Sequence, residues 1–207
     1  MIKIERASVM NIDNAIRGAR NPMNSWERSD SYYTEKGEFV LGEVDRDFGK
    51  RLCRSGSDHR KFIRQILVSV DITAPLYWWK EFDTYKVGTV ANSCSTMHKI
   101  HTKSFDRDDF SCDRLDVEGL RMLDGLIEYL ERERVKFCDN KEERQPWHNM
   151  IQLLPSSYNQ MRTVSLNYEN LINIYYARKN HKLAEWHVLC DWIRTLPYAE
   201  DWILVKD

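Results

Sequence analysis

The stretch LPSSYNQMRTVSLNYENLINIYYAR, residues 154–178, determines how the C-terminal part of this chain folds. Its Leu-Pro pair breaks the helix before it, because a residue that precedes proline is disfavoured in helical geometry. A strand is predicted around Met161 to Leu166, and a helix from Asn167 to Arg178. A strand that leads directly into a helix indicates a fold that mixes both kinds of element.

The segments around this stretch continue the mixture. Helices are predicted from Trp147 to the Leu-Pro break and from Leu183 to Thr195, and apolar residues at helical spacing predict an amphipathic helix over Asp116 to Arg134. The remaining expected elements are strands at Ile2–Ser8 and Phe62–Asp71, helices at Asp13–Arg20, Asp45–Arg54 and Ala74–Phe82, a long loop over 21–44, and an irregular polar segment over Val87–Met97.

The expected fold class is therefore α+β, with helices packed on a mixed or antiparallel sheet. The chain has 207 residues and no internal repeat. That length lies within the usual range of one domain, so we expect a single domain over residues 1–207.

Composition excludes several functional classes. Lys and Arg total 31 against 32 Asp and Glu, a formal net charge of -1, so the chain lacks the broad positive field of a general nucleic-acid-binding protein. The longest strongly apolar run, Ile66 to Val70, is too short to span a bilayer, and the first residues lack the layout of a signal peptide. Five scattered cysteines without a C-x-x-C pair favour reduced thiols. We expect a cytoplasmic protein that binds neither membranes nor nucleic acid.

Local motifs are few. The phosphate-binding glycine loops, the zinc-protease helix and the hydrolase elbow are all absent. Cys94, His98 and His101 could present ligands to zinc if they lay on one helix, with Cys112 or an acidic residue as a fourth, but spaced Cys and His residues often recur by chance. No metal is therefore expected.

Two residues have both a functional and a structural interpretation. His59 follows a Gly-Ser-Asp turn, where an imidazole can bind a ligand or cap the turn, and the structural role is slightly favoured. Arg178 ends a predicted helix, where a guanidinium can clamp a phosphate. Taken alone, Arg178 fits better as a solvated helix end.

Read in order, the segments resemble the flavin-dependent thymidylate synthase family over residues 45–195. Asp58-His59 stands where the family has Glu-His before a strand, and Thr84-Tyr85-Lys86 stands where it has Arg-His-Arg after a helix that opens at a proline. The family's S-x-N-E-x-S-x-R-Y loop is matched only by its Asn and one Ser, at Asn92 and Ser95. The C-terminal matches are Leu154-Pro155, Asn167, Arg178 and Ala184-Glu185-Trp186.

The chain departs from the family pattern at several charged positions. The Glu of the family loop falls on Ser93, and its Arg-Tyr on Met97-His98. A family Arg before the Leu-Pro pair is Ile151 here, and one after the Asn is Glu169. Tyr85 and Lys86 fit equally well as an ordinary helix end with a cation near the dipole.

The resemblance implies a site and a reaction. FAD would be held by His59, Asn92, Ser95 and Asn167, and the pyrimidine nucleotide by Glu81, Tyr85, Lys86 and Arg178. Arg178 would also be catalytic, polarising the pyrimidine. The reaction would convert dUMP to dTMP, or methylate a related nucleotide, with methylenetetrahydrofolate as carbon donor and NADPH as reductant, in a homotetramer.

Two other interpretations remain open at this point. A non-catalytic relative could keep the fold and a nucleotide pocket after losing the flavin-binding charges. Alternatively the matches are accidental, and the aromatic residues serve an oligomeric scaffold, because analogy of fold alone is a weak basis for function.

Overall fold

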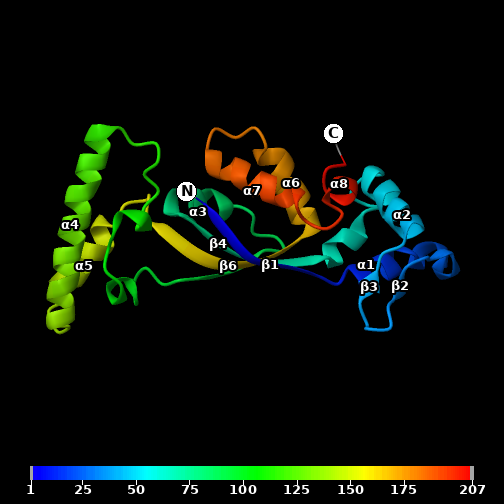
Figure 1. The fold of residues 1–207 in the computed structure, drawn as a ribbon, viewed down its shortest axis with the longest axis horizontal. Coiled ribbons are helices and arrows are strands. Elements are labelled where there is room, and N and C mark those ends of the chain that lie inside the picture. The colour runs from blue at the N-terminus through cyan, green and yellow to red at the C-terminus, as the bar shows by residue number, and fades with distance from the viewer. Residues whose placement is uncertain (1, 206–207) are drawn as a thin grey trace. The chain divides into compact units, whose positions relative to one another are not determined.

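The structure, a computed structural model, describes residues 2–205 (Figure 1). These residues divide into two compact units, each assembled from segments that are distant in the sequence. Unit 1 comprises residues 2–3, 71–84 and 91–163, and unit 2 comprises residues 4–70, 85–90 and 164–205. The single domain expected over residues 1–207 stays a prediction.

Four strands form one sheet in the order β1-β4-β6-β5. Their bounds are β1 Lys3–Met10, β4 Leu67–Pro75, β5 Val90–Ser93 and β6 Asn159–Asn167. β2 (Tyr32–Tyr33) and β3 (Phe39–Val40) pair as a separate antiparallel hairpin, with Tyr33 opposite Phe39. Together with the helices described next, these strands confirm the α+β class.

Unit 1 is built around two neighbouring helices, α4 (Val117–Asp139) and α5 (Gln145–Leu153), which lie side by side in Figure 1. Asp116 accepts a hydrogen bond from the Gly119 N–H at 2.8 Å and so caps α4. Helix α3 (Leu76–Phe82) belongs to the same unit and buries Trp78 and Trp79. The core next to α4 and α5 consists of Ile100, Phe105, Phe110, Leu123, Leu130, Phe137 and Met150.

Unit 2 contains the remaining α-helices and the 3-10 helix η3. These are α1 (Ile12–Ala19), α2 (Glu43–Arg54), the 3-10 helix η3 (Lys61–Gln65), α6 (Tyr168–Arg178), α7 (Ala184–Arg194) and α8 (Ala199–Trp202). Trp186 of α7 and Trp202 of α8 are fully buried. Within residues 2–205 no helix is long and apolar enough to cross a membrane.

Three predicted segments differ from the structure. The strand expected over 62–71 begins only at Leu67, because residues 61–65 form η3, which buries Phe62 and Ile63 as neighbours along the chain. The polar segment over 87–97 contains β5, whose residues are all exposed and therefore show no alternation. The loop expected over 21–44 contains the β2–β3 hairpin and the 3-10 helices η1 (Asn21–Met23) and η2 (Trp26–Arg28).

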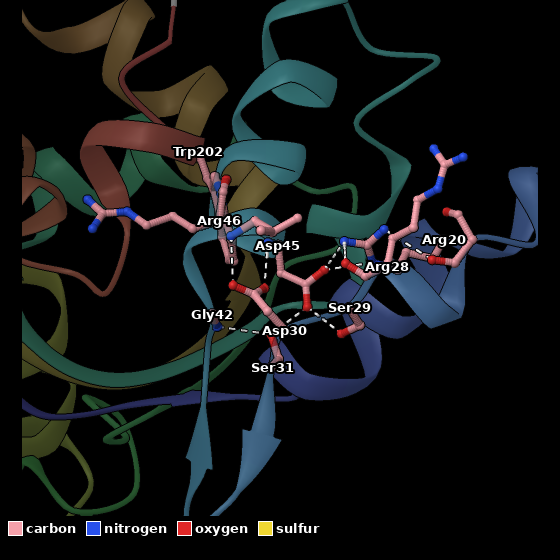
Figure 2. Close-up of polar contacts among 11 residues, drawn as sticks. Arg20, Arg28, Ser29, Asp30, Ser31, Gly42, Asp45, Arg46 and Trp202 are labelled. Carbon is pink, nitrogen blue, oxygen red and sulfur yellow. Dashed lines mark hydrogen bonds and ion pairs between the residues drawn. The ribbon is translucent and has the colours of Figure 1, made fainter.

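A buried ion pair organises residues 20–45 (Figure 2). Arg20 donates from Nε to the Asp45 carboxylate at 2.6 Å, and both side chains are almost completely buried. The Ser29 and Ser31 hydroxyls donate to the other oxygen of Asp45, each at 2.5 Å. The Arg20 guanidinium also donates to the carbonyls of Ser25 and Arg28, both at 3.1 Å. The segment predicted as a loop is thus fixed by side-chain hydrogen bonds.

Asp30 anchors the same segment to the start of α2. Its carboxylate accepts the N–H groups of Val44 and Asp45, at 2.9 and 3.0 Å, which otherwise lack partners in the first helical turn. Gly42 precedes the helix, and a Cβ at that position would lie 2.1 Å from the Asp30 carboxyl carbon. Glycine at residue 42 therefore allows the cap to form.

Candidate functional site

Arg178 ends α6 and lies between two aromatic side chains of unit 2. Its Nε donates a hydrogen bond to the Tyr85 hydroxyl at 2.9 Å, and its guanidinium carbon lies 4.5 Å from the centre of the Trp186 ring. The Tyr85 and Trp186 rings meet edge to face, with 6.1 Å between their centres. A guanidinium fixed by a stacked ring and a hydroxyl presents its planar fork in one orientation. Arg178 is therefore not a freely solvated helix end.

His181 borders the same cluster. Its ring centre lies 6.2 Å from that of Trp186, and its Nδ1 accepts a hydrogen bond from the Leu183 N–H at 3.2 Å. Because Nδ1 is an acceptor here, the proton of the neutral imidazole is placed on Nε2. Sequence analysis did not assign Trp186 or His181 to the site, although Trp186 lies in the Ala-Glu-Trp match.

His59 borders a cavity of about 660 Å³ in unit 2. Volumes of this size are typical of small-molecule sites. Its apolar walls include Phe48, Leu52 and Phe62, and its polar rim includes Asp58, Lys61 and Gln65 next to His59. A mostly apolar cleft with a few polar groups at its edge is suited to a flat ring system with polar substituents.

The turn that carries His59 is fixed by its neighbour, Arg60. The N–H groups of both residues donate to the Gly56 carbonyl at 3.2 Å, and Gly56 itself has φ +101°, which favours glycine. The buried Arg60 guanidinium forms two hydrogen bonds, of 2.9 and 2.8 Å, with the Glu169 carboxylate in the first turn of α6. Glu169 therefore has a charge partner close to it in space. The sequence did not predict this pair, because the two residues are far apart along the chain.

Asn167 begins α6 through a reciprocal cap. Its side chain accepts from the Asn170 N–H at 3.0 Å, and the Asn170 side chain accepts from the Asn167 N–H at 3.1 Å. The Asn170 amide also donates to the Val87 carbonyl at 2.7 Å, which ties the segment with Tyr85 and Lys86 to α6. The observed role of Asn167 is structural, and its predicted place in a flavin pocket remains a prediction.

The other predicted site residues belong to unit 1. Glu81 is half-buried on α3 and Asn92 is exposed on β5. The Ser95 hydroxyl accepts the N–H groups of Met97 and His98, at 3.2 and 2.9 Å, and closes a tight turn. Ser95 also lines a cavity of about 350 Å³ together with Lys99 and Lys103. The structure tests none of their predicted ligand contacts.

Two of the five cysteines, Cys53 and Cys190, are buried. Residues 94–99 form turns rather than a helix, so Cys94 and His98 do not share a helical face. Across residues 2–205, no group of three or more His, Cys, Asp and Glu side chains could hold a metal ion. Burial raises the pKa of Cys53 to about 12 and that of Cys190 to about 11, so both stay protonated at neutral pH.

Comparison with known proteins identifies the fold. No protein-family model and no curated protein sequence matches the chain. A crystal structure of thymidylate synthase X from Helicobacter pylori with FAD and dUMP has a TM-score of 0.69 at 15% identity, covering 98% of this chain and 97% of that one. A UMP/dUMP methylase from Streptomyces cacaoi bound with 5-Br dUMP has a TM-score of 0.65 at 14% identity, covering 99% and 95%. The chain is similar to both over its full length in fold.

Proposed function

We propose that this chain binds FAD and a pyrimidine nucleotide and methylates the nucleotide, converting dUMP to dTMP or carrying out a related one-carbon transfer. The observation that carries the proposal is that one compact unit holds both the His59 cavity and the Arg178 cluster. The likeness of fold to a thymidylate synthase and to a UMP/dUMP methylase supports it.

The residues at the His59 cavity fit a flavin. Phe48 and Phe62 offer apolar walls for the ring system, while His59 and Lys61 place polar groups at its edge. When bound, reduced flavin supplies the hydride of the reaction. Asn92, Ser95 and Asn167 are proposed as further flavin contacts.

Arg178 is proposed to hold and polarise the pyrimidine. A pyrimidine must become electron-rich at C5 before it attacks a one-carbon unit, and a guanidinium beside its O2 edge stabilises the negative charge that develops. Tyr85 and Trp186 keep the Arg178 fork in one plane, so little reorganisation is needed when that charge appears. Glu81 and Lys86 are proposed nucleotide contacts, Lys86 at the phosphate.

The remaining features follow from the same resemblance. We propose NADPH as the reductant, methylenetetrahydrofolate as the carbon donor, a homotetrameric assembly and a cytoplasmic location. Binding of FAD and of dUMP can be measured without NADPH or methylenetetrahydrofolate.

The test begins with flavin binding. The purified protein is incubated with FAD, desalted and scanned over the flavin bands between about 300 and 550 nm. We expect retained flavin whose bands shift when dUMP is added. His59→Ala should weaken retention while His148→Ala, another exposed histidine, should not. No retained flavin at any FAD concentration would exclude the flavin-dependent reaction.

Turnover separates the enzyme from a binding protein. Arg178→Ala should keep the flavin but lose the dUMP-induced band shift and any dTMP formed from methylenetetrahydrofolate and NADPH. dTMP formation that is unchanged in Arg178→Ala would remove this residue from the mechanism.

A non-catalytic nucleotide-binding protein is the second candidate function. It is favoured by two positions at which the family resemblance leads us to expect Arg. Ile151 packs against the core of unit 1, and the Glu169 carboxylate accepts a hydrogen bond from the Arg60 guanidinium. Neither residue supplies a positive charge to a ligand. Nucleotide binding without flavin would support this candidate.

A further inference from the structure

A second cavity in unit 2 has aromatic walls. It has a volume of about 390 Å³ and lies between α1, the segment around Trp26 and the β2–β3 hairpin. Trp26, Tyr33 and Phe39 form its aromatic walls, and Ile16 adds a further apolar surface. His59 is not among its lining residues, which distinguishes it from the proposed flavin cavity.

The aromatic walls are exposed yet held in place. Trp26 is 49% exposed and Tyr33 is 58% exposed, so neither ring is buried in the core. The Trp26 Nε1 donates to the Asn21 side chain at 2.9 Å, and the Tyr33 hydroxyl donates to the Asp13 carboxylate. Tyr33 also packs against Phe39, with 5.4 Å between ring centres. Exposed rings fixed through their polar ends form a preorganised surface for a flat ligand.

The buried Arg20–Asp45 pair explains why these walls stay in place. Arg20 itself lines the cavity and fixes the carbonyls on either side of Trp26. Ser29 and Ser31, which also line it, donate to Asp45. Figure 2 shows the contacts of Asp45 with Arg20, Ser29 and Ser31. The walls are therefore attached to a buried charge pair rather than to a free loop.

A third cavity, of about 370 Å³, adjoins the aromatic one and has a different lining. Asn14 and Arg17 line both cavities. The amide side chains of Asn11, Asn21 and Gln65 provide the rest of its polar surface, and Asn21 and Gln65 also line the His59 cavity. The pair of cavities thus places an aromatic compartment beside an amide-lined one.

Arg17 is the charged group shared by both cavities. Among the described residues its side chain donates a hydrogen bond to Asn14 Oδ1, at 2.8 Å from Nη2, and it interacts electrostatically with the Asp13 carboxylate of the aromatic cavity. Its exposed guanidinium has five N–H donors, so several remain for an anion. An arginine fork between an aromatic and an amide-lined compartment matches a ligand with a flat base, hydroxyl groups and a phosphate.

We propose that these two cavities bind a nucleoside 5′-monophosphate unit, with its base against Trp26 and Tyr33, its phosphate at Arg17 and its sugar facing the amides. The unit can come from a free nucleotide or from the AMP half of a dinucleotide such as FAD or NADPH. Every nucleobase has a flat face that can stack on an aromatic ring. The cavities are therefore expected to bind nucleoside monophosphates as a class rather than one particular base.

AMP is the probe, titrated calorimetrically into the full-length protein. We expect saturable binding that weakens about tenfold or more in Arg17→Ala and in Trp26→Ala. Arg51→Ala removes an exposed arginine of α2 outside both cavities and should bind AMP like the unaltered chain. Because Arg17 and Trp26 are exposed, both variants should fold, which circular dichroism checks.

Further arms identify the source and separate this proposal from the proposed function. Adenosine should bind about tenfold more weakly than AMP, because it lacks the phosphate. Competition by FAD but not by FMN identifies the AMP half of the dinucleotide, and competition by neither identifies a free nucleotide. His59→Ala should leave AMP binding intact even if flavin retention fails. No AMP binding at millimolar concentration, or binding unchanged in both variants, would overturn the proposal.

Discussion

At the residue scale, the hydrogen-bonded carboxylate of Asp45 is the most sensitive single group. Asp45→Asn keeps the shape of the side chain but leaves the Arg20 guanidinium buried without its counter-ion. Breaking a buried ion pair from one side is strongly destabilising, so we expect the free energy of unfolding to fall by about 3 kcal/mol. Urea denaturation measures it, with Asp47→Asn, an exposed residue of α2, as the control.

The same residue predicts a pH dependence. Burial opposes ionisation of Asp45, but hydrogen bonds from Ser29, Ser31 and Arg20 outweigh it and hold the pKa below its usual value. The folded state therefore binds this proton less tightly than the unfolded state. The stabilisation is complete above the ordinary pKa of about 3.9 and is lost as the pH falls through the lower, folded value. Below about pH 5, the unaltered chain should lose stability more steeply on acidification than Asp45→Asn, and parallel curves would contradict this.

Tyr85 predicts a separate effect on binding. Tyr85→Phe keeps the ring against Trp186 but removes the hydroxyl that accepts from Arg178 Nε. Removing one such hydrogen bond costs about 1 kcal/mol, so the affinity for dUMP should fall up to about fivefold and the free energy of unfolding by at most about 1 kcal/mol. Tyr32→Phe, which alters an exposed ring, is the control. Equal dUMP affinity in the two variants would show that Arg178 needs no positioning by Tyr85.

The residues of the site could be predicted only where a local pattern or the family order marked them. The family order assigned His59, Tyr85 and Arg178 to the site, which stays a prediction, and the structure brings the last two into contact. Arg60 and Glu169 lie 109 positions apart, and nothing in either local sequence shows that they pair. Long-range polar pairs of this kind depend on the finished fold.

At the element scale, prediction succeeded where apolar periodicity was strong. The helix expected over 116–134 is α4, and the strand and helix of residues 161–178 are β6 and α6. It was least accurate where local polar contacts decide the structure, as in residues 21–44, whose shape depends on Asp45. A composition rich in Asn, Ser and charge resembles a mobile loop until its buried partner is known.

Helix packing in unit 2 gives an element-scale prediction. Gly49 on α2 faces α8 so closely that a Cβ would lie 2.7 Å from the Trp202 Nε1. Trp202 is fully buried and has little room to move. Gly49→Ala should therefore lower the free energy of unfolding by about 1 to 3 kcal/mol, in spite of the better helix propensity of alanine.

A matched control for Gly49→Ala exists on α4. A Cβ at Gly125 would have no neighbour within 4 Å. Gly125→Ala should raise the free energy of unfolding by about 0.5 to 1 kcal/mol. Thermal denaturation of the two variants should thus give shifts of opposite sign, and a shared sign would exclude close packing as the cause.

At the scale of the whole molecule, the question is whether units 1 and 2 unfold together. β4 and β6 are continuous strands that each have residues in both units. In β4, residues 67–70 belong to unit 2 and 71–75 to unit 1. In β6, residues 159–163 belong to unit 1 and 164–167 to unit 2. Unfolding one unit would cut both strands within their lengths and expose backbone groups that the sheet pairs. We therefore predict one cooperative transition, as a single domain over 1–207 requires.

Hydrogen exchange with a bound ligand tests this prediction. A ligand at about 100 times its dissociation constant slows exchange about 100-fold at amides that open only by global unfolding. The proposed flavin cavity lies in unit 2, where Phe48 and Leu52 of α2 line it, so FAD should protect the slowest amides of α2 directly. If unfolding is cooperative, the slowest amides of α4 and α5 in unit 1 gain the same factor, although they line no part of that cavity. Protection confined to unit 2 would mean that the chain consists of two thermodynamic domains joined through shared strands.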